Sequence, residues 1–125
     1  MYSSQIAVQI DLEYKSDRKC VMRLVALVDR DGRLQAGELY GYSKERSDLS
    51  ETLTLYPLLL TDVTKECRRY QAEWGFSDST ETVIDFLDRP LAELQEVERV
   101  DTSEGVPEHS IYIITSIVPW LGSEE

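Results

Sequence analysis

Near its start the chain alternates large apolar residues with polar ones, and this alternation strongly restricts how the segment can fold. Every second residue of the segment 6–14 is large and apolar: Ile6, Val8, Ile10, Leu12 and Tyr14. A period of two places such side chains on one face of a β-strand, with the polar residues on the other face. The segment is therefore predicted to be a half-buried strand.

Two more strands are expected in the first third of the chain. Residues 15–18 are polar and form the first turn, and residues 20–28 are almost continuously apolar, as in a strand covered on both faces. Asp31-Gly32 favours a tight hairpin turn, because the preferred two-residue turn needs positive φ. Residues 34–42 are expected to be the third strand, with a bulge or twist at its glycines.

The middle of the chain has the spacing of an amphipathic helix. Its apolar residues recur three and four positions apart, as Leu60, Val63, Cys67, Tyr70 and Trp74. Pro57 suits the first helical position, where a missing N–H is not needed, and Gly75 is placed to cap the C-terminus. These features predict a helix that begins at Pro57 and ends at Trp74.

A second helix is predicted over residues 78–88. Asp78 and Glu81 have the spacing of a capping box, and Arg89-Pro90 would end the helix. Outside the helices we expect a short edge strand at 52–56, a weak strand near 97–100, a loop at 102–109 and a strong strand at 111–118 that Pro119 ends. The expected fold is α+β: one domain with an antiparallel sheet of about five strands and two helices packed on one face.

Charge is distributed very unevenly along the chain. Residues 1–72 contain 11 acids and 11 bases, whereas residues 73–125 contain 13 acids and 2 bases, which accounts for the whole net charge of −11. Apolar residues are threaded through the acidic part, so it is expected to fold rather than to form a disordered tail. Net charge kept only for solubility would be spread over the whole surface, so the asymmetry favours a functional interpretation.

This composition excludes several partner classes. An acidic chain lacks the basic side chains that bind nucleic acid directly or that dock on an anionic membrane. We see no signal peptide, and no apolar run approaches the ~20 residues needed to cross a bilayer. Cys20 and Cys67 are too few to form a disulfide framework, so we expect small core residues in a reducing, cytoplasmic setting.

Motifs for catalysis, metals and cofactors are weak or absent in the sequence. His109 is the only histidine, and its neighbours match no nucleophile motif. The segment 29–32 superficially resembles the start of a calcium loop, but a hairpin turn explains it better. The six glycines form no phosphate-binding pattern. We therefore expect no catalytic residues, no metal site and no cofactor.

The acidic residues are the remaining candidates for a functional site. On a helix, Asp78, Glu81, Asp85 and Asp88 would lie within about 80° of one another, at roughly 100° per residue. Carboxylates spaced in this way present negative charge at intervals similar to those of phosphates on a nucleic-acid strand. We expect these four residues to bind a partner, and the predicted site continues along Glu93, Glu96 and Glu98.

The sequence thus favours a non-enzymatic acidic inhibitor that occupies a basic, nucleic-acid-binding surface of a partner protein. Immunity proteins of nuclease toxins and phage anti-defence proteins are similar in size and charge. One alternative is an acidic chaperone or adaptor that binds an extended client segment through a sheet edge and apolar grooves. Another is a small metal-dependent enzyme that uses carboxylate pairs such as Asp62 and Glu66, or Glu93 and Glu96.

Overall fold

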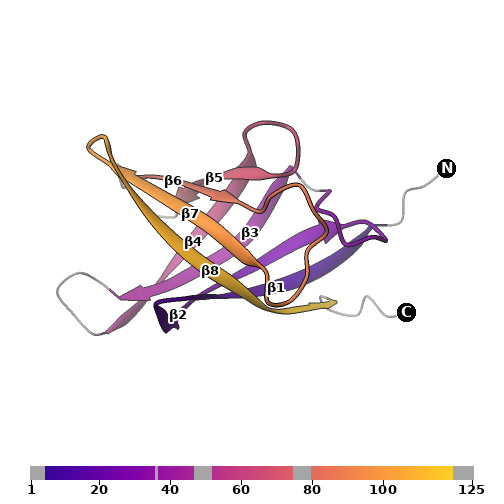
Figure 1. Ribbon diagram of the computed structural model, residues 1–125, viewed down its shortest axis with the longest axis horizontal. Helices are drawn as coiled ribbons and strands as arrows, with labels where there is room; N and C mark the ends of the chain where they lie inside the picture. Colours follow the sequence, from indigo (N-terminus) through magenta and orange to yellow (C-terminus); the bar gives the residue numbers. More distant parts are fainter. Residues whose placement is uncertain (1–4, 36, 47–51, 75–79, 120–125) are drawn as a thin grey trace.

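Eight antiparallel β-strands form the described part of the protein (Figure 1). This computed structural model describes residues 5–35, 37–46, 52–74 and 80–119. The strands are β1 (Ile6–Tyr14), β2 (Asp17–Val28), β3 (Glu38–Arg46), β4 (Leu53–Asp62), β5 (Arg69–Trp74), β6 (Glu81–Asp85), β7 (Glu96–Ser103) and β8 (Val106–Pro119).

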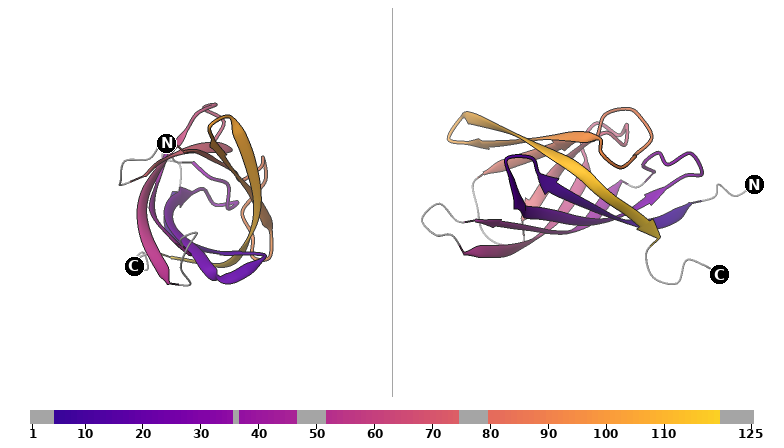
Figure 2. Two further views of the ribbon diagram at one scale, coloured as in Figure 1. Left: turned by 90° about the vertical axis from the view of Figure 1, so that its left-hand side faces the viewer. Right: turned by 60° about the horizontal axis from the view of Figure 1, so that its bottom comes forward.

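Each strand pairs with the next one along the chain, and β8 returns to pair with β1, so that the sheet closes into a barrel. The view along the barrel in Figure 2 shows this ring of strands. The closing pairs include Ile10 with Ile117 and Tyr14 with Tyr112, and the register shifts between Asp11 and Leu12. Closure gives the first and last strands of the described sheet a neighbour on both sides.

The barrel has two different ends. At the turn end, on the left in Figure 1, β1 and β2 are joined at residues 15–16, and β7 and β8 at residues 104–105. At the opposite end, the loop end, lie the connections of β2 to β3, of β4 to β5 and of β6 to β7. The last of these loops is tied across the barrel opening, because the Leu91 N–H donates to the carbonyl of Gly32 at 2.9 Å. Leu91 is buried there and helps to close the loop end.

The interior follows from the alternation of side chains along each strand. In β1 the buried residues are Val8, Ile10 and Leu12, as the period of two predicts. Three loop residues, Leu34, Phe86 and Leu91, also belong to the core. The same alternation in the other strands contributes the remaining core residues: Met22, Leu24, Ala26, Val28, Leu39, Leu58, Leu60, Tyr70, Ala72, Ile84, Val97, Tyr112 and Ile114. A barrel of eight strands is narrow enough for side chains to fill.

The predicted α+β fold is wrong, since the described residues form eight strands and contain no helix. The predicted helix from Pro57 to Trp74 is instead β4, a turn and β5. Its apolar spacing of three and four joins residues from two strands: Leu58 and Leu60 alternate inward on β4, and Tyr70 and Ala72 do so on β5. The loop between the two strands has a length that keeps the apolar residues three and four positions apart, as they would be in a helix.

Pro57 lies within β4 and not at the start of a helix. It pairs with Tyr42 on β3, and the described pairs of β4 with β5 run from Leu58 to Asp62.

The second predicted helix is also wrong, because residues 81–85 form β6. Asp78, its expected cap, lies outside the described residues. The predicted loop at 102–109 is a continuous hairpin whose two turn residues, Glu104 and Gly105, have φ of 53° and 79°. Positive φ at both central positions is the geometry of a tight hairpin turn.

The predicted strands at 6–14, 20–28 and 111–118 lie within β1, β2 and β8. The described chain has no helix with the length and apolar character needed to cross a membrane.

Gly41 allows β2 and β3 to approach each other closely. It pairs with Leu24, and a Cβ placed on Gly41 would overlap the backbone carbonyl oxygen of Arg23. Since both partners are backbone atoms in paired strands, neither can move without disturbing the ladder.

We expect Gly41→Ala to lower the free energy of unfolding by about 3 kcal/mol, because the strands must separate to admit the methyl group. Gly37→Ala is the matched control, since nothing lies within 4 Å of a Cβ at that position. Urea unfolding of both variants checks the expectation, and equal stability of the two would contradict it.

Candidate binding surfaces of the barrel

Several of the predicted site residues share one outer face. Because Thr82 and Ile84 are buried inside the barrel, Glu81 and Asp85 point outward from β6. On β7 the same alternation turns Glu96 and Glu98 outward, and Glu98 pairs with Asp85 across the strands. Asp88 and Glu93 lie apart from them, in the loop that follows β6. The structure therefore brings together four of the seven predicted residues, on neighbouring strands rather than on a helix.

Cations from residues 1–72 pair with three of the predicted carboxylates. Asp88 accepts from Arg33 at 2.9 Å, and Glu96 accepts from Lys15 at 2.7 Å. Asp85 accepts from Arg68 at 3.0 Å and also contacts Arg69 at 3.4 Å. These ion pairs connect residues that are far apart in the sequence, and those of Asp88 and Glu96 lie on the surface. Glu98 contacts His109 at 2.8 Å, while Glu81 and Glu93 form no ion pair with any residue that the structure describes.

Asp85 is the most structurally engaged of the seven. Besides its arginine partners, it accepts a hydrogen bond from the Leu87 N–H at 2.8 Å, which orders the start of the loop after β6. Partial burial pushes the pKa of Asp85 upward, but the hydrogen bonds and charges of Arg68, Leu87 and Arg69 outweigh that effect. The pKa of this carboxyl therefore lies below its usual value of 3.8.

Four carboxylates at the turn end lack such cations, and we call this group the acidic rim: Glu73, Glu81, Glu104 and Glu108. Glu73 and Glu81 are exposed on β5 and β6, beyond Gln71 with Val83, the last pair of the β5–β6 ladder. Glu104 and Glu108 belong to the β7–β8 hairpin, which projects at the left in Figure 1. Within the described chain, no member of the rim forms an ion pair.

Two features of the hairpin tip are unfavourable for the isolated protein. Glu104 has positive φ, a conformation that glycine, asparagine or aspartate adopts at lower cost. Val106, next to it, is an aliphatic side chain that is 67% exposed. Like charges on adjacent strands are also destabilising. The rim thus combines uncompensated negative charge with an exposed apolar contact.

Inside the barrel, near the turn end, a buried arginine organises a polar group that the sequence analysis missed. The Arg99 guanidinium donates to Asp101 at 2.9 Å and to Glu45 at 2.6 Å, and also to Ser43 and Tyr112. It lies 5.2 Å from the centre of the Trp74 ring, within range of a cation–π contact. We call these residues, together with Thr82, the Arg99 cluster.

The Arg99 cluster is a closed hydrogen-bond network. Thr82 accepts from the Trp74 indole at 3.2 Å and donates to Asp101 at 2.6 Å. Burial tends to lower the pKa of Arg99, but the nearby Tyr112, Glu45 and Asp101 raise it, and the net direction is upward. A permanently charged guanidinium is therefore held within the barrel by two carboxylates that are themselves partly exposed.

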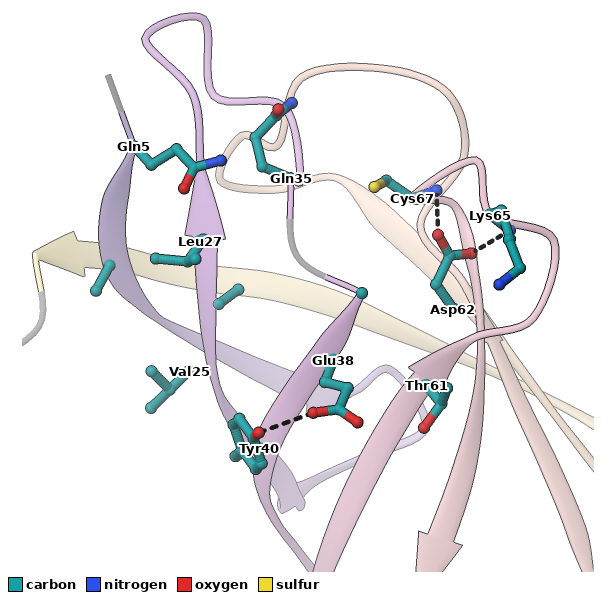
Figure 3. A pocket seen from close by; sticks show the side chains of 13 residues that line it. Gln5, Val25, Leu27, Gln35, Glu38, Tyr40, Thr61, Asp62, Lys65 and Cys67 are labelled. Carbon is teal, nitrogen blue, oxygen red and sulfur yellow. Dashed lines mark hydrogen bonds between the residues drawn. The ribbon is translucent and has the colours of Figure 1, made fainter. Parts of the chain in front are cut away.

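A groove opens at the other end of the barrel, where β2 and β3 separate (Figure 3). Its volume is about 1240 Å³. Figure 3 shows Val25 and Leu27 on one side, Asp62 and Cys67 on the other, and Tyr40 between them. The exposed surface of the lining is mainly apolar, and the lining also contains charged side chains such as Glu38 and Lys65.

The described ranges contain no group of three His, Cys, Asp or Glu residues arranged to hold a metal ion. Of the carboxylate pairs considered above, Asp62 ends β4 and accepts from the backbone N–H groups of Lys65 and Cys67. Its carboxylate therefore orders the following turn.

A sequence signal for the Arg99 cluster exists but depends on recognising β7. Residues 97, 99 and 101 of this strand point inward, so a buried Val97 is followed by Arg99 and Asp101 at interior positions. Charged residues at inward positions of a strand must be paired. The groove has no comparable signal, because it arises where two strands stop pairing.

Arg99→Met is expected to lower the free energy of unfolding by about 3 kcal/mol, because Glu45 and Asp101 lose their counterion in a partly buried site. Arg23→Met is the matched control: Arg23 pairs with Asp11 on the surface, where loss of the pair costs about 1 kcal/mol or less. Chemical unfolding measures both. Similar losses in the two variants would contradict a special role for the cluster.

Asp85→Asn is expected to destabilise the barrel by about 1–2 kcal/mol near neutral pH, through loss of charge-assisted hydrogen bonds. Because the folded-state pKa of Asp85 is depressed, its contribution is present above the usual value of 3.8 and is lost as the pH falls through the folded pKa. The stability gap between wild type and variant should therefore shrink in acid. A gap that stays constant with pH for Asp85→Asn would refute the assignment.

No protein-family model matches the chain, and neither a curated protein nor a solved structure matches it. The acidic rim, the Arg99 cluster and the groove are therefore the features from which a function can be inferred.

Proposed function

We propose that this protein is a non-enzymatic acidic inhibitor that binds a basic, nucleic-acid-binding surface of a partner protein. The observation that carries the proposal is the acidic rim, whose carboxylates lack cationic partners within the described chain. On β1 and β2, by contrast, outward acids pair with nearby arginines, as Asp11 does with Arg23 and Glu13 does with Arg18. The charge asymmetry of the sequence thus persists after local pairing.

The rim has the properties expected of a surface that attracts a cationic partner. Uncompensated carboxylates on β5, β6 and the β7–β8 hairpin favour encounter with a positively charged groove. Closed pairing holds β5, β6, β7 and β8 in place, so little conformational entropy is lost on binding. Val106 and Pro107 at the hairpin tip add apolar contact area next to the charges.

The contact residues differ from those expected for a helix. Asp85, Asp88 and Glu96 are engaged in ion pairs that stabilise the fold, so their role in recognition is indirect. Glu81 remains in the binding surface and is joined by Glu73, Glu104 and Glu108. Glu98, with its exposed histidine partner, lies on the same outer face.

The double substitution Glu73→Lys with Glu81→Lys should weaken binding to the partner by about tenfold or more, because it reverses charge within the rim. The matched control is Asp31→Lys with Glu66→Lys, which changes the net charge equally but lies in the loops at the opposite end. Basic proteins from the native host, enriched on heparin, provide the bait pool. Retention on immobilised wild type and variants is then compared at low and high salt, and again with the purified partner.

Loss of binding in the rim variant alone supports the proposal. Equal losses in both double variants would show that only the overall charge matters, and binding that is insensitive to salt would also contradict it. A partner that still binds its nucleic acid while complexed would reject the inhibitory part of the proposal.

A further inference from the structure

The ladder between β2 and β3 stops before either strand ends. The last pair is Val25 with Tyr40, and the same register would place Leu27 opposite Glu38. That pair does not form. Instead the Leu27 carbonyl accepts from the Gln35 N–H at 2.9 Å, and Val28 bridges to Leu34. A gap therefore opens between β2 and β3 at the loop end of the barrel.

Backbone polar groups of Glu38 face this gap. Along a strand, alternate residues direct their N–H and C=O groups to opposite sides. The Asp62 N–H donates to Gly37 at 2.8 Å, so residue 37 faces β4. Glu38 and Tyr40 consequently face β2. Tyr40 finds its partner in Val25, whereas Glu38 has none on β2.

The side chains around the gap are largely apolar. Val25 and Leu27 project from β2, and Ala7 pairs with Leu27 from β1. Leu27 and Tyr40 are 37% and 56% exposed. The groove volume of about 1240 Å³ exceeds the roughly 300–1,000 Å³ typical of small-molecule pockets.

A single uncompensated carboxylate lies at the centre of the groove. Glu38 accepts a hydrogen bond from the Tyr40 hydroxyl at 2.9 Å, and this bond raises the pKa of the tyrosine. Within the described chain Glu38 has no ion-pair partner, although the lining also contains one cation, Lys65, near Asp62. The two carboxylates outnumber this cation. The neighbouring Asp62 is occupied by the N–H groups of the following turn. In Figure 3, Glu38 points into the space between Tyr40 and Thr61.

We infer that this groove binds an extended polypeptide segment of a partner protein, with apolar side chains at alternate positions and a lysine or arginine that pairs with Glu38. A polypeptide is the occupant that offers main-chain groups to the open backbone of Glu38 while filling an apolar groove. The carboxylate and the net charge of −11 favour a cationic segment. The groove lies at the loop end, so this site is independent of the acidic rim.

The experiment selects ligands from a phage-displayed library of random peptides of about 10 residues against the full chain. The expected consensus alternates aliphatic residues and contains lysine or arginine. Leu27→Ser should weaken the selected peptide about tenfold or more, with an unchanged unfolding midpoint because Leu27 is partly exposed. Glu38→Lys should reverse the charge preference, so that it binds a version of the peptide whose basic residue is replaced by glutamate.

Two controls separate this site from general electrostatics and from the rim. Glu66→Lys lies in the neighbouring loop outside the groove lining, and Glu73→Lys with Glu81→Lys lies at the turn end. Both should bind the selected peptide like the wild type at about 0.15 M salt.

Three results would overturn the inference. The first is a selected peptide whose affinity is unaffected by Leu27→Ser and Glu38→Lys. The second is a dimer, seen by light scattering, that Leu27→Ser dissociates, since a second copy would then occupy the groove. The third is tight binding of the neutral fluorophore N-phenyl-1-naphthylamine that selected peptides fail to displace, which would indicate a site for small apolar molecules.

Discussion

Pairing between β1 and β8 is the constraint on which the rest of the structure depends. These strands come from opposite ends of the described chain, and their ladder from Val8–Pro119 to Tyr14–Tyr112 turns a meander of hairpins into a closed ring. In a closed sheet the first and last strands pair with each other, so their backbone N–H and C=O groups are not left at an open edge. Each strand then buries one face inside the barrel. Closure also defines an inside and an outside, and thereby decides which residue of each alternating pair meets solvent.

The inside is divided by chemistry. Towards the loop end the barrel is filled by aliphatic and aromatic residues such as Leu39, Tyr70 and Phe86. Towards the turn end, Arg99 and its two carboxylates replace part of that packing with a charged network. A buried ion group of this kind adds little net stability compared with apolar packing, but it strongly penalises arrangements that separate its members. It therefore favours the one register that brings β3 and β7 into correct opposition across the interior.

On the outer surface, some carboxylates form ion pairs within the described chain and others are free to contact a partner protein. Asp85, Asp88 and Glu96 connect distant segments through Arg68, Arg33 and Lys15, while the acidic rim at the turn end has no such partners within the described chain. This division could not be seen in the sequence, because a cation that pairs with an acid in three dimensions can lie tens of residues away. Glu81 was recognisable as a candidate from local charge alone. Its separation from Asp88 was not, since the two are neighbours only on the helix that does not form.

The sequence by itself determined the strands whose apolar alternation is uninterrupted, such as β1, and the charge imbalance between the two halves of the chain. Both are local properties that survive any fold. Only the tertiary structure decided that residues 57–74 form two strands, because the inward residues Leu60 and Tyr70 are separated by a turn whose length mimics a helical phase. The tertiary structure also decided where the gap beside Glu38 opens and which carboxylates contact Arg99. Both depend on long-range strand pairing. Side-chain periodicity describes one segment at a time, whereas a barrel is defined by which segments become neighbours.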